Sequence, residues 1–321
     1  MSEFALIQKF FTVQPIARDD VILGIGDDAA ILQPPPGSQL VVTTDTLVEA
    51  VHFVAGADPV ALGYKSLAVN LSDLAAMGAE PAWFLLNLTL PQPDETWLTG
   101  FSKGLFALAQ EFKLQLVGGN IARGPLTISI EAHGVVPEGE AIRRSGAQPG
   151  DGIYVTGTLG DAALALEQRL GRRALPPPDY DAVSLRLDHP LPRVREGILL
   201  RRFASSAIDI SDGLLADLGH VLEASGAGAL VVRDRVPLSE IYRKHLGGIG
   251  WDLALNGGDD YELLFTVPAR ARREFERWQT RFGCPVTNIG EIVSGPGLTV
   301  LDAAGELTRP MRPGHDHFSG D

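Results

Sequence analysis

The chain has 321 residues, with 27 Lys and Arg against 40 Asp and Glu, and its formal net charge is −13. With 45% apolar residues, it has the composition of a globular protein of about two domains, which excludes disorder. The acidic balance argues against nucleic acid as a main partner, and no apolar run is long enough to span a membrane. The beginning of the chain lacks a basic region followed by an apolar stretch, so we expect the cytoplasm rather than secretion. The single cysteine, Cys284, excludes an internal disulfide and a thiolate metal site.

The first half alternates between predicted strands and helices. Asp58 and Pro59 are typical of a helix start, and Gly78 of a helix end. In chain order we predict a strand over 21–26, a strand over 40–48, a helix over 58–77, a strand over 83–90, a helix over 94–112, and strands over 114–117 and 127–136.

The segment 143–152 is rich in turn residues, and we place the domain boundary beside it, giving domains 1–140 and 141–321. The second half again alternates, so the predicted fold class is α/β or α+β. Its predicted elements are a strand over 153–156, a helix from 161, a strand over 207–210, a helix that begins with Ser211 as N-cap and ends near 225–226, a Gly-rich loop over 253–260, a strand over 262–267 and a helix over 269–282.

Many aspartates lie in apolar or Gly-rich segments instead of on polar faces. A lone buried carboxylate is costly, but several of them can share a cation. Mg²⁺ prefers oxygen ligands and often binds together with substrate phosphates. The aspartates in question are Asp27, Asp28, Asp45, Asp73, Asp209, Asp212, Asp259 and Asp260.

Two of these aspartates have specific neighbours. Asp73 shares a polar stripe with Ser66 and Asn70 on an otherwise apolar helix, as the spacing of three and four residues requires. Asp45 shares one strand face with Thr43, although Asp is disfavoured in strands. Either aspartate could be a metal ligand. The alternatives are a hydrogen-bonded structural Asp73 and an Asp45 that caps a turn.

The segment 208–214, Ile-Asp-Ile-Ser-Asp-Gly-Leu, is predicted to run from a strand into a helix start. Backbone N–H groups at such a start favour phosphate. Two carboxylates beside it would repel the phosphate unless a cation lies between the carboxylates and the phosphate. This indicates a nucleotide with Mg²⁺, although Ser211 could serve only as an N-cap. Gly118-Gly119-Asn120 is not a Walker motif, and Gly24-Ile25-Gly26 lacks the third glycine of the dinucleotide fingerprint. Both could be plain turns.

Taken together, these segments resemble the thiamine-monophosphate kinase family. The matching stretches occur in order over nearly the whole chain: Gly-Ile-Gly-Asp-Asp-Ala-Ala at 24–30, Thr-Thr-Asp-Thr-Leu-Val at 43–48, His-Phe at 52–53, Asn-Leu-Ser-Asp-Leu-Ala-Ala-Met-Gly-Ala at 70–79, Gly-Gly-Asn at 118–120, Arg-Arg-Ser-Gly at 143–146, Ile-Asp-Ile-Ser-Asp-Gly-Leu at 208–214 and Gly-Gly-Asp-Asp-Tyr-Glu-Leu at 257–263.

The resemblance implies a two-domain fold like that of aminoimidazole ribonucleotide synthetase. Domain 1–140 would bind ATP and Mg²⁺ and form a homodimer through its sheet, and domain 141–321 would complete the active site. The implied activity is ATP-dependent phosphorylation of thiamine monophosphate to the diphosphate with several Mg²⁺. The implied metal ligands are Asp28, Thr43, Thr44, Asp45, Asp73, Asn120, Asp209 and Asp212. The implied ATP contacts are Asp73, Gly119, Asn120, Arg144 and Ser211, and the implied substrate contacts are His52, Glu262 and Phe318.

One departure from the family is Asn120, where the family commonly has Asp. The amide keeps an oxygen ligand but lacks the charge, so one Mg²⁺ is expected to bind more weakly. The acceptor is already a phosphate monoester, so we expect direct in-line transfer without a strong general base and without a phosphoenzyme. The alternatives are another ATP-using enzyme of the superfamily and a non-catalytic nucleotide-binding maturation factor. Selenophosphate synthetase is disfavoured because its N-terminal loop usually carries a reactive cysteine, and the only thiol here is Cys284.

Overall fold

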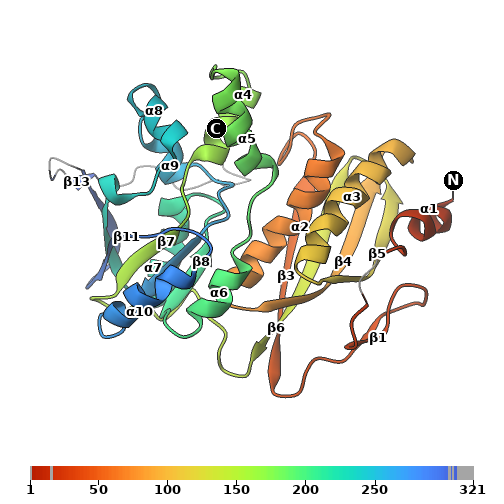
Figure 1. Ribbon diagram of the computed structural model, residues 1–321, viewed down its shortest axis with the longest axis horizontal. Helices are drawn as coiled ribbons and strands as arrows, with labels where there is room; N and C mark the ends of the chain where they lie inside the picture. The colour runs from red at the N-terminus through yellow and green to blue at the C-terminus, as the bar shows by residue number, and fades with distance from the viewer. Residues whose placement is uncertain (1, 15–16, 303–304, 306, 309–321) are drawn as a thin grey trace. The chain divides into compact units, whose positions relative to one another are not determined.

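The structure is a computed structural model, and it describes residues 2–14, 17–302, 305 and 307–308 (Figure 1). The chain forms two compact units, one made of Met1–Leu74 with Ala79–Ala141, the other of Ala75–Gly78 with Ile142–Asp321. Residues 75–78 comprise the last two residues of the helix Pro59–Ala76 and the two residues after it, yet they belong to the second unit, so the division does not fall at a single point in the sequence. Within the described residues, no helix has the length and apolar character needed to cross a bilayer.

The first unit is a four-stranded sheet covered by two helices on one face (Figure 1). The strand order is β3-β6-β4-β5, and only the pair β4 and β5 is parallel. The elements are α1 (Glu3–Phe10), β1 (Val21–Leu23), β2 (Ile31–Leu32), β3 (Ser38–Val48), α2 (Pro59–Ala76), β4 (Glu80–Leu90), α3 (Glu95–Glu111), β5 (Gln115–Arg123) and β6 (Thr127–Pro137).

The covering helices form as their residues require. Asp58 caps α2 by accepting the Ala61 N–H at 3.1 Å, and Pro59 is its first residue. The helices α2 and α3 approach so closely that a Cβ at Gly63 would overlap the carbonyl oxygen of Phe101. Apolar side chains along α2 are buried against this helix and the sheet. The apolar sequence of α2 therefore places most of the helix in the interior of the first unit, with Asp73 half-buried on it.

The second unit is a seven-stranded sheet in the order β13-β12-β9-β11-β7-β10-β8, antiparallel except for β12 and β9. Its strands are β7 (Gly152–Thr156), β8 (Ser206–Asp209), β9 (Gly228–Val232), β10 (Leu263–Val267), β11 (Val286–Val293), β12 (Gly297–Leu301) and β13 (Leu307–Thr308). Its helices are α4 (Asp161–Arg169), α5 (Pro177–Asp188), α6 (Val194–Leu200), α7 (Leu214–Ser225), α8 (Glu240–Ile249), α9 (Asp252–Asn256) and α10 (Arg272–Trp278), with short 3₁₀ turns η1 (Arg233–Arg235) and η2 (Gln279–Arg281).

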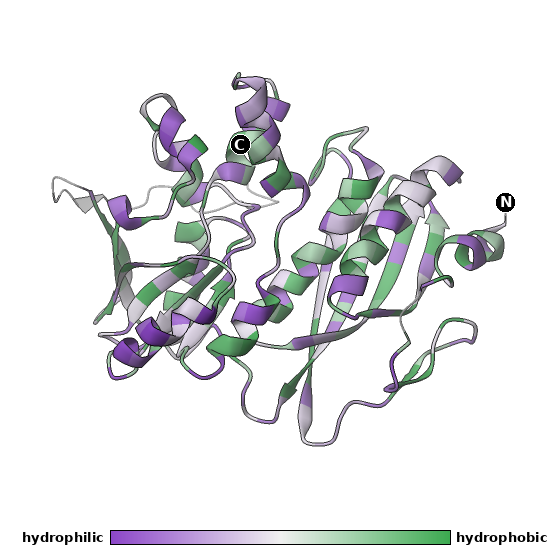
Figure 2. Ribbon diagram, viewed as in Figure 1, coloured by the Kyte–Doolittle hydropathy of each residue, from purple (hydrophilic) through white to green (hydrophobic). Residues whose placement is uncertain are grey.

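Two apolar clusters stabilise the second unit. One packs Leu214, Leu218 and Val221 of α7 against strand residues such as Ile208 and Leu264. The other joins α4, α5, α8 and α9 around the buried Tyr242. In Figure 2 the strands carry mostly apolar colour, whereas α8 and α10 carry mostly polar colour. The strands β8 and β10, which lead to predicted site residues, are thus anchored in the first of these clusters.

Three predictions about local structure are wrong. The Gly118-Gly119 pair does not form a turn after a strand, because β5 continues through it to Arg123. A register shift beside Leu85 marks a bulge there, and Gly119 has φ +145° with no room for a Cβ beside the Leu86 carbonyl. The loop predicted at 253–260 contains the short helix α9. The third error, at Ser211, concerns the candidate site.

Candidate active site

In the first unit, the structure brings together Thr43, Asp45 and Asp73. The Thr43 hydroxyl donates to Asp73 Oδ2 at 2.5 Å, which joins β3 to α2. Burial, together with the nearby Asp73 carboxylate, raises the pKa of Asp45 to about 7. The direction of this shift means that the surroundings disfavour the ionised form of Asp45. Such an arrangement of hard oxygen donors fits a divalent cation, which would favour the ionised form.

Other predicted metal ligands of the first unit lie elsewhere. Asp28 is exposed in the loop between β1 and β2, where its N–H donates to Asp27 Oδ1 at 2.8 Å. The Thr44 hydroxyl donates to the Ile130 carbonyl at 3.0 Å, and by strand alternation its side chain lies on the face opposite to Asp45. Across the described part of the chain, no three His, Cys, Asp or Glu side chains gather as a metal site of their own would require.

The predicted ligand Asn120 also lies on the other face of the sheet. It pairs with Asn87 of β4, which pairs with Ser129 of β6, which pairs with Thr46 of β3. Residues in one such row point to the same side, and neighbouring rows point to opposite sides. Because Asp45 belongs to the neighbouring row, the structure does not bring Asn120 to the Asp45 carboxylate.

The predicted substrate contact His52 follows β3 in a turn. Its Nδ1 accepts the Val48 N–H at 3.0 Å, so the neutral ring carries its proton on Nε2. The ring is half-buried. The turn therefore fixes the tautomer of the neutral His52 ring.

In the second unit, two segments far apart in sequence are hydrogen-bonded to each other. The Asp259 N–H donates to the Ser211 carbonyl at 2.9 Å, and the Tyr261 N–H to the Ile210 carbonyl at 2.8 Å. Asp259 and Tyr261 have φ of +68° and +50°. Positive φ is rare in residues with a side chain, and such strain concentrates at functional sites. The segments 210–213 and 257–262 are thus held side by side, directly after Asp209, the last residue of β8.

The segment after β8 differs from the prediction that Ser211 caps a helix. Helix α7 begins at Leu214, and the N-cap position is Gly213 with φ +118°. The N–H groups of Ser211, Asp212 and Gly213 each donate to Asp217 Oδ2 at 3.1 Å. Burial and the Asp212 charge raise the pKa of Asp217 to about 7, and these three donors oppose the rise. The sequence predicts that this helix start favours an anion such as phosphate. In the structure, the Asp217 carboxylate accepts these N–H groups in place of a bound anion.

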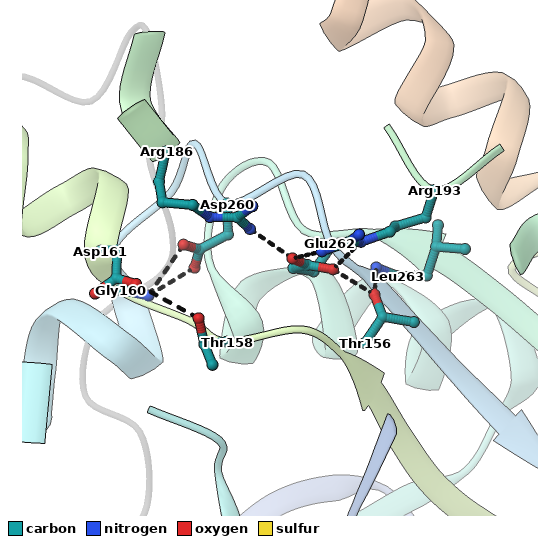
Figure 3. Close-up of polar contacts among 9 residues, drawn as sticks. All are labelled: Thr156, Thr158, Gly160, Asp161, Arg186, Arg193, Asp260, Glu262 and Leu263. Atoms are coloured by element: carbon teal, nitrogen blue, oxygen red, sulfur yellow. Dashed lines mark hydrogen bonds and ion pairs between the residues drawn. The ribbon is translucent and has the colours of Figure 1, made fainter. Parts of the chain in front are cut away.

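Glu262 is fully buried between two arginines, as Figure 3 shows. Its Oε1 accepts from Arg186 and Arg193 at 2.5 Å each, and its Oε2 accepts from Arg193 Nε and the Thr156 hydroxyl at 2.6 Å each. Both carboxylate oxygens of Glu262 are thus occupied by donors from the protein itself. Direct contact between Glu262 and a substrate stays a prediction.

Two further carboxyl groups lie beside this network (Figure 3). Both oxygens of Asp260 accept the Gly160 N–H at 3.0 Å, and burial raises the pKa of Asp260 well above its ordinary value. Burial also raises the pKa of Asp161, against the hydrogen bond of 2.7 Å from the Ser239 hydroxyl. The Gly-Gly-Asp-Asp segment is thereby fixed to the start of α4.

The remaining predicted residues are placed as follows. Arg144 is exposed in the turn that follows the unit boundary, and its carbonyl accepts from the Ser225 hydroxyl at 3.4 Å. Phe318 lies outside the described residues. Sequence reasoning missed Arg186, Arg193 and Asp217. For Asp217 a signal existed, because it is an acidic residue in the first turn of an otherwise apolar helix that follows a glycine.

Comparisons with known proteins agree over both units. Residues 26–136 match the family of AIR synthase related proteins, N-terminal domain, and residues 148–303 match the C-terminal domain. The thiamine-monophosphate kinases of Salmonella typhimurium and Escherichia coli strain K12 are 47% and 46% identical to the chain, each alignment covering 99% of this chain and 98% of the relative.

Solved structures give the same result. The crystal structure of thiamine-monophosphate kinase from Stenotrophomonas maltophilia K279a is 48% identical, with a TM-score of 0.86 over 96% of this chain and 98% of that chain. A complex of AaThiL with AMPPCP and TMP is 33% identical, with a TM-score of 0.79 over 92% of each chain. The hydrogenase maturation protein HypE in complex with ATP is 21% identical with a TM-score of 0.76 over 96% of this chain and 95% of that chain, a likeness of fold alone.

Proposed function

Because the chain belongs to the thiamine-monophosphate kinase family, we propose that it transfers the γ-phosphoryl group of ATP to thiamine monophosphate, giving thiamine diphosphate and ADP. The observation that carries this proposal is the similarity over the full length of both chains, joined to the hard-oxygen site of Thr43, Asp45 and Asp73. AaThiL, a relative with the same fold, has been solved with an ATP analogue and TMP. The cytoplasm is the compartment we propose, since ATP is the co-substrate.

We propose that the aspartates of the site hold Mg²⁺. The oxygens of Thr43, Asp45 and Asp73 fit this ion, and the resemblance adds Asp28, Asp209 and Asp212. Thr44 and Asn120, which the resemblance also implies, lie on the opposite face of the sheet and are not part of this proposal. Bound Mg²⁺ supplies charge neutralisation, which two polyanionic reactants require. The resemblance also assigns ATP contacts to Asp73, Gly119, Asn120, Arg144 and Ser211, and substrate contacts to His52, Glu262 and Phe318.

The proposed reaction is a direct transfer between the two bound reactants. The acceptor oxygen of thiamine monophosphate is already ionised at neutral pH, so no residue has to remove a strongly held proton. In the transfer, the bond between the γ-phosphorus and the bridging oxygen breaks, and a bond from the acceptor oxygen to phosphorus forms in line. ADP leaves with the bridging oxygen. No side chain becomes phosphorylated in this scheme.

We also propose that the chain forms a homodimer through the open face of the four-stranded sheet. On the edge strand β3, Leu40 and Val42 are 47% and 52% exposed on the face opposite to α2. Exposed apolar residues in alternation on a sheet are typical of an interaction surface. Light scattering with Val42→Lys would test this, since a charged side chain at a dimer interface should give monomers.

The function is tested by incubating the chain with ATP, Mg²⁺ and thiamine monophosphate and measuring thiamine diphosphate by chromatography. Equimolar thiamine diphosphate and ADP are expected. Binding of ATP without turnover would favour a non-catalytic nucleotide-binding protein instead. Incubation with γ-³²P-labelled ATP but no acceptor should leave the protein unlabelled, and a trapped phospho-residue would overturn direct transfer.

A further inference from the structure

Asp217 is a buried carboxylate whose role lies outside the residues assigned to the reaction. It is 2% exposed, lies in the first turn of α7, and accepts three successive backbone N–H groups on one oxygen. The donors belong to Ser211, Asp212 and Gly213, each at 3.1 Å. A carboxylate that accepts hydrogen bonds from several backbone N–H groups restrains the backbone that carries them.

These bonds change how the segment can meet a phosphate. The N–H groups at the start of a helix usually bind an anionic ligand directly. Here the three N–H groups donate to Asp217. The segment therefore contacts a nucleotide through the side chains of Ser211 and Asp212. Phosphate oxygens must then be held by the Ser211 hydroxyl and by a cation that Asp212 ligates, not by the amides.

The surroundings make Asp217 a rigid support. Its neighbours Leu214 and Leu218 are buried in the core of the second unit. On the other side of the segment, Gly213 has φ +118°, and a Cβ there would lie 2.8 Å from the Asn256 carbonyl oxygen. A side chain held by a packed helix can place a binding segment to within a fraction of an ångström.

We propose that Asp217 is a positioning residue that sets Ser211 and Asp212 for contact with Mg²⁺ and ATP. This inference rests on the proposed function, which assigns those two contacts. It predicts an effect specific to the nucleotide, because the amides that Asp217 holds belong only to this segment.

The test compares Asp217→Ala and Asp217→Asn with the control Asp94→Ala. Asp94 also accepts two backbone N–H groups at a helix start, those of Thr96 and Trp97 at 2.9 and 3.0 Å, but it caps α3 in the first unit. For Asp217→Ala we expect the KM for MgATP to rise about tenfold or more, with the KM for thiamine monophosphate within about twofold. Asp217→Asn should have a smaller effect, because its amide oxygen can take the place of Oδ2. Asp94→Ala should lower the thermal midpoint and leave both KM values unchanged.

Other results overturn the inference. A lower thermal midpoint for Asp217→Ala with an unchanged KM for MgATP, or an equal rise in both KM values, makes Asp217 merely structural. If Asp217→Ala does not fold, the same split must appear in Asp217→Asn, and its absence is equally decisive. If the wild-type chain has no kinase activity, the proposed function fails, and calorimetry with AMPPCP and Mg²⁺ still tests this inference: Asp217→Ala should weaken binding about tenfold.

Discussion

Two carboxylates, Asp45 in the first unit and Glu262 in the second, are held in opposite ways. In the first unit, burial and the neighbouring Asp73 raise the pKa of Asp45 to about 7. In the second, Glu262 is more deeply buried, but Arg186 and Arg193 donate to both of its oxygens. One carboxylate is held where its ionised form is disfavoured, and the other is surrounded by donors of opposite charge.

The difference separates a carboxylate whose charge is balanced within the protein from one whose charge is not. A buried ion pair of good geometry is complete and needs nothing more from solution. A pair of carboxylates whose surroundings disfavour ionisation is costly unless a ligand compensates for it, and such groups gather at functional sites. The resemblance implies that Asp45 and Asp73 bind metal and that Glu262 contacts the substrate. Only the structure shows how differently their neighbours balance their charges. The predictions below test this contrast, from the largest expected effect to the smallest.

The largest effect on stability is expected for Glu262→Gln. Removing the charge leaves Arg186 and Arg193 partly buried without their anion, which should lower the free energy of unfolding by about 3–5 kcal/mol. Denaturant unfolding measures this change. The control is Glu167→Gln, which removes exposed ion pairs to Arg172 at 3.2 Å and Arg173 at 3.9 Å and should cost at most about 1 kcal/mol. Equal costs for the two variants would refute the contrast.

Asp73→Asn should affect activity, not folding. Loss of one charge at the metal site should reduce kcat about a hundredfold or more, which is about 2.7 kcal/mol. The thermal midpoint should not fall, because the substitution removes a charge that raises the pKa of Asp45. Asp58→Asn, at the start of the same helix, is the control, since Asn caps helices equally well. Turnover near that of the wild type would remove Asp73 from the metal set.

The pH dependence of the metal-free protein tests Asp45. The pKa of Asp45 is about 7 in the folded state against an ordinary 3.8. The contribution of Asp45 to the free energy of unfolding is therefore fully present below about pH 4 and is lost as the pH rises to about 7. The loss amounts to at most about 1.4 kcal/mol per pH unit within this window. The difference between wild type and Asp45→Asn in urea unfolding isolates the contribution, because Asp217, which titrates in the same range, cancels. Parallel profiles would contradict it, and added Mg²⁺ should flatten the wild-type slope.

The smallest effect is expected for Asn120→Asp. This substitution restores the carboxylate common in the family, but the row of Asn87, Ser129 and Thr46 places it on the face away from Asp45. We therefore expect the Mg²⁺ concentration for half-maximal activity to change by less than about threefold, or about 0.7 kcal/mol. A tenfold decrease in the titration would instead place residue 120 beside the metal.

Sequence reasoning succeeded where a pattern has one structural solution. The alternation in 40–48 correctly placed Thr43 and Asp45 on one face, and the apolar helix with a polar stripe correctly placed Asp73 inward beside them. It failed where one pattern has several solutions. Gly118-Gly119 fits a turn or a bulge, and Ser211 fits an N-cap or a loop, because both choices satisfy the same local backbone demands.

The sequence by itself determined the α/β class, the family and the residue types that meet a phosphate and a cation, because periodicity and motif order are local properties of the chain. Only the tertiary structure decided which acids are balanced by arginines and which face of the sheet carries Asn120. It also decided that the N–H groups of residues 211–213 donate to Asp217 instead of to a nucleotide. The first two decisions depend on contacts between distant parts of the chain, such as Arg193 and Glu262, which are 69 residues apart. The third depends on the backbone path that brings residues 211–213 within hydrogen-bond distance of Asp217.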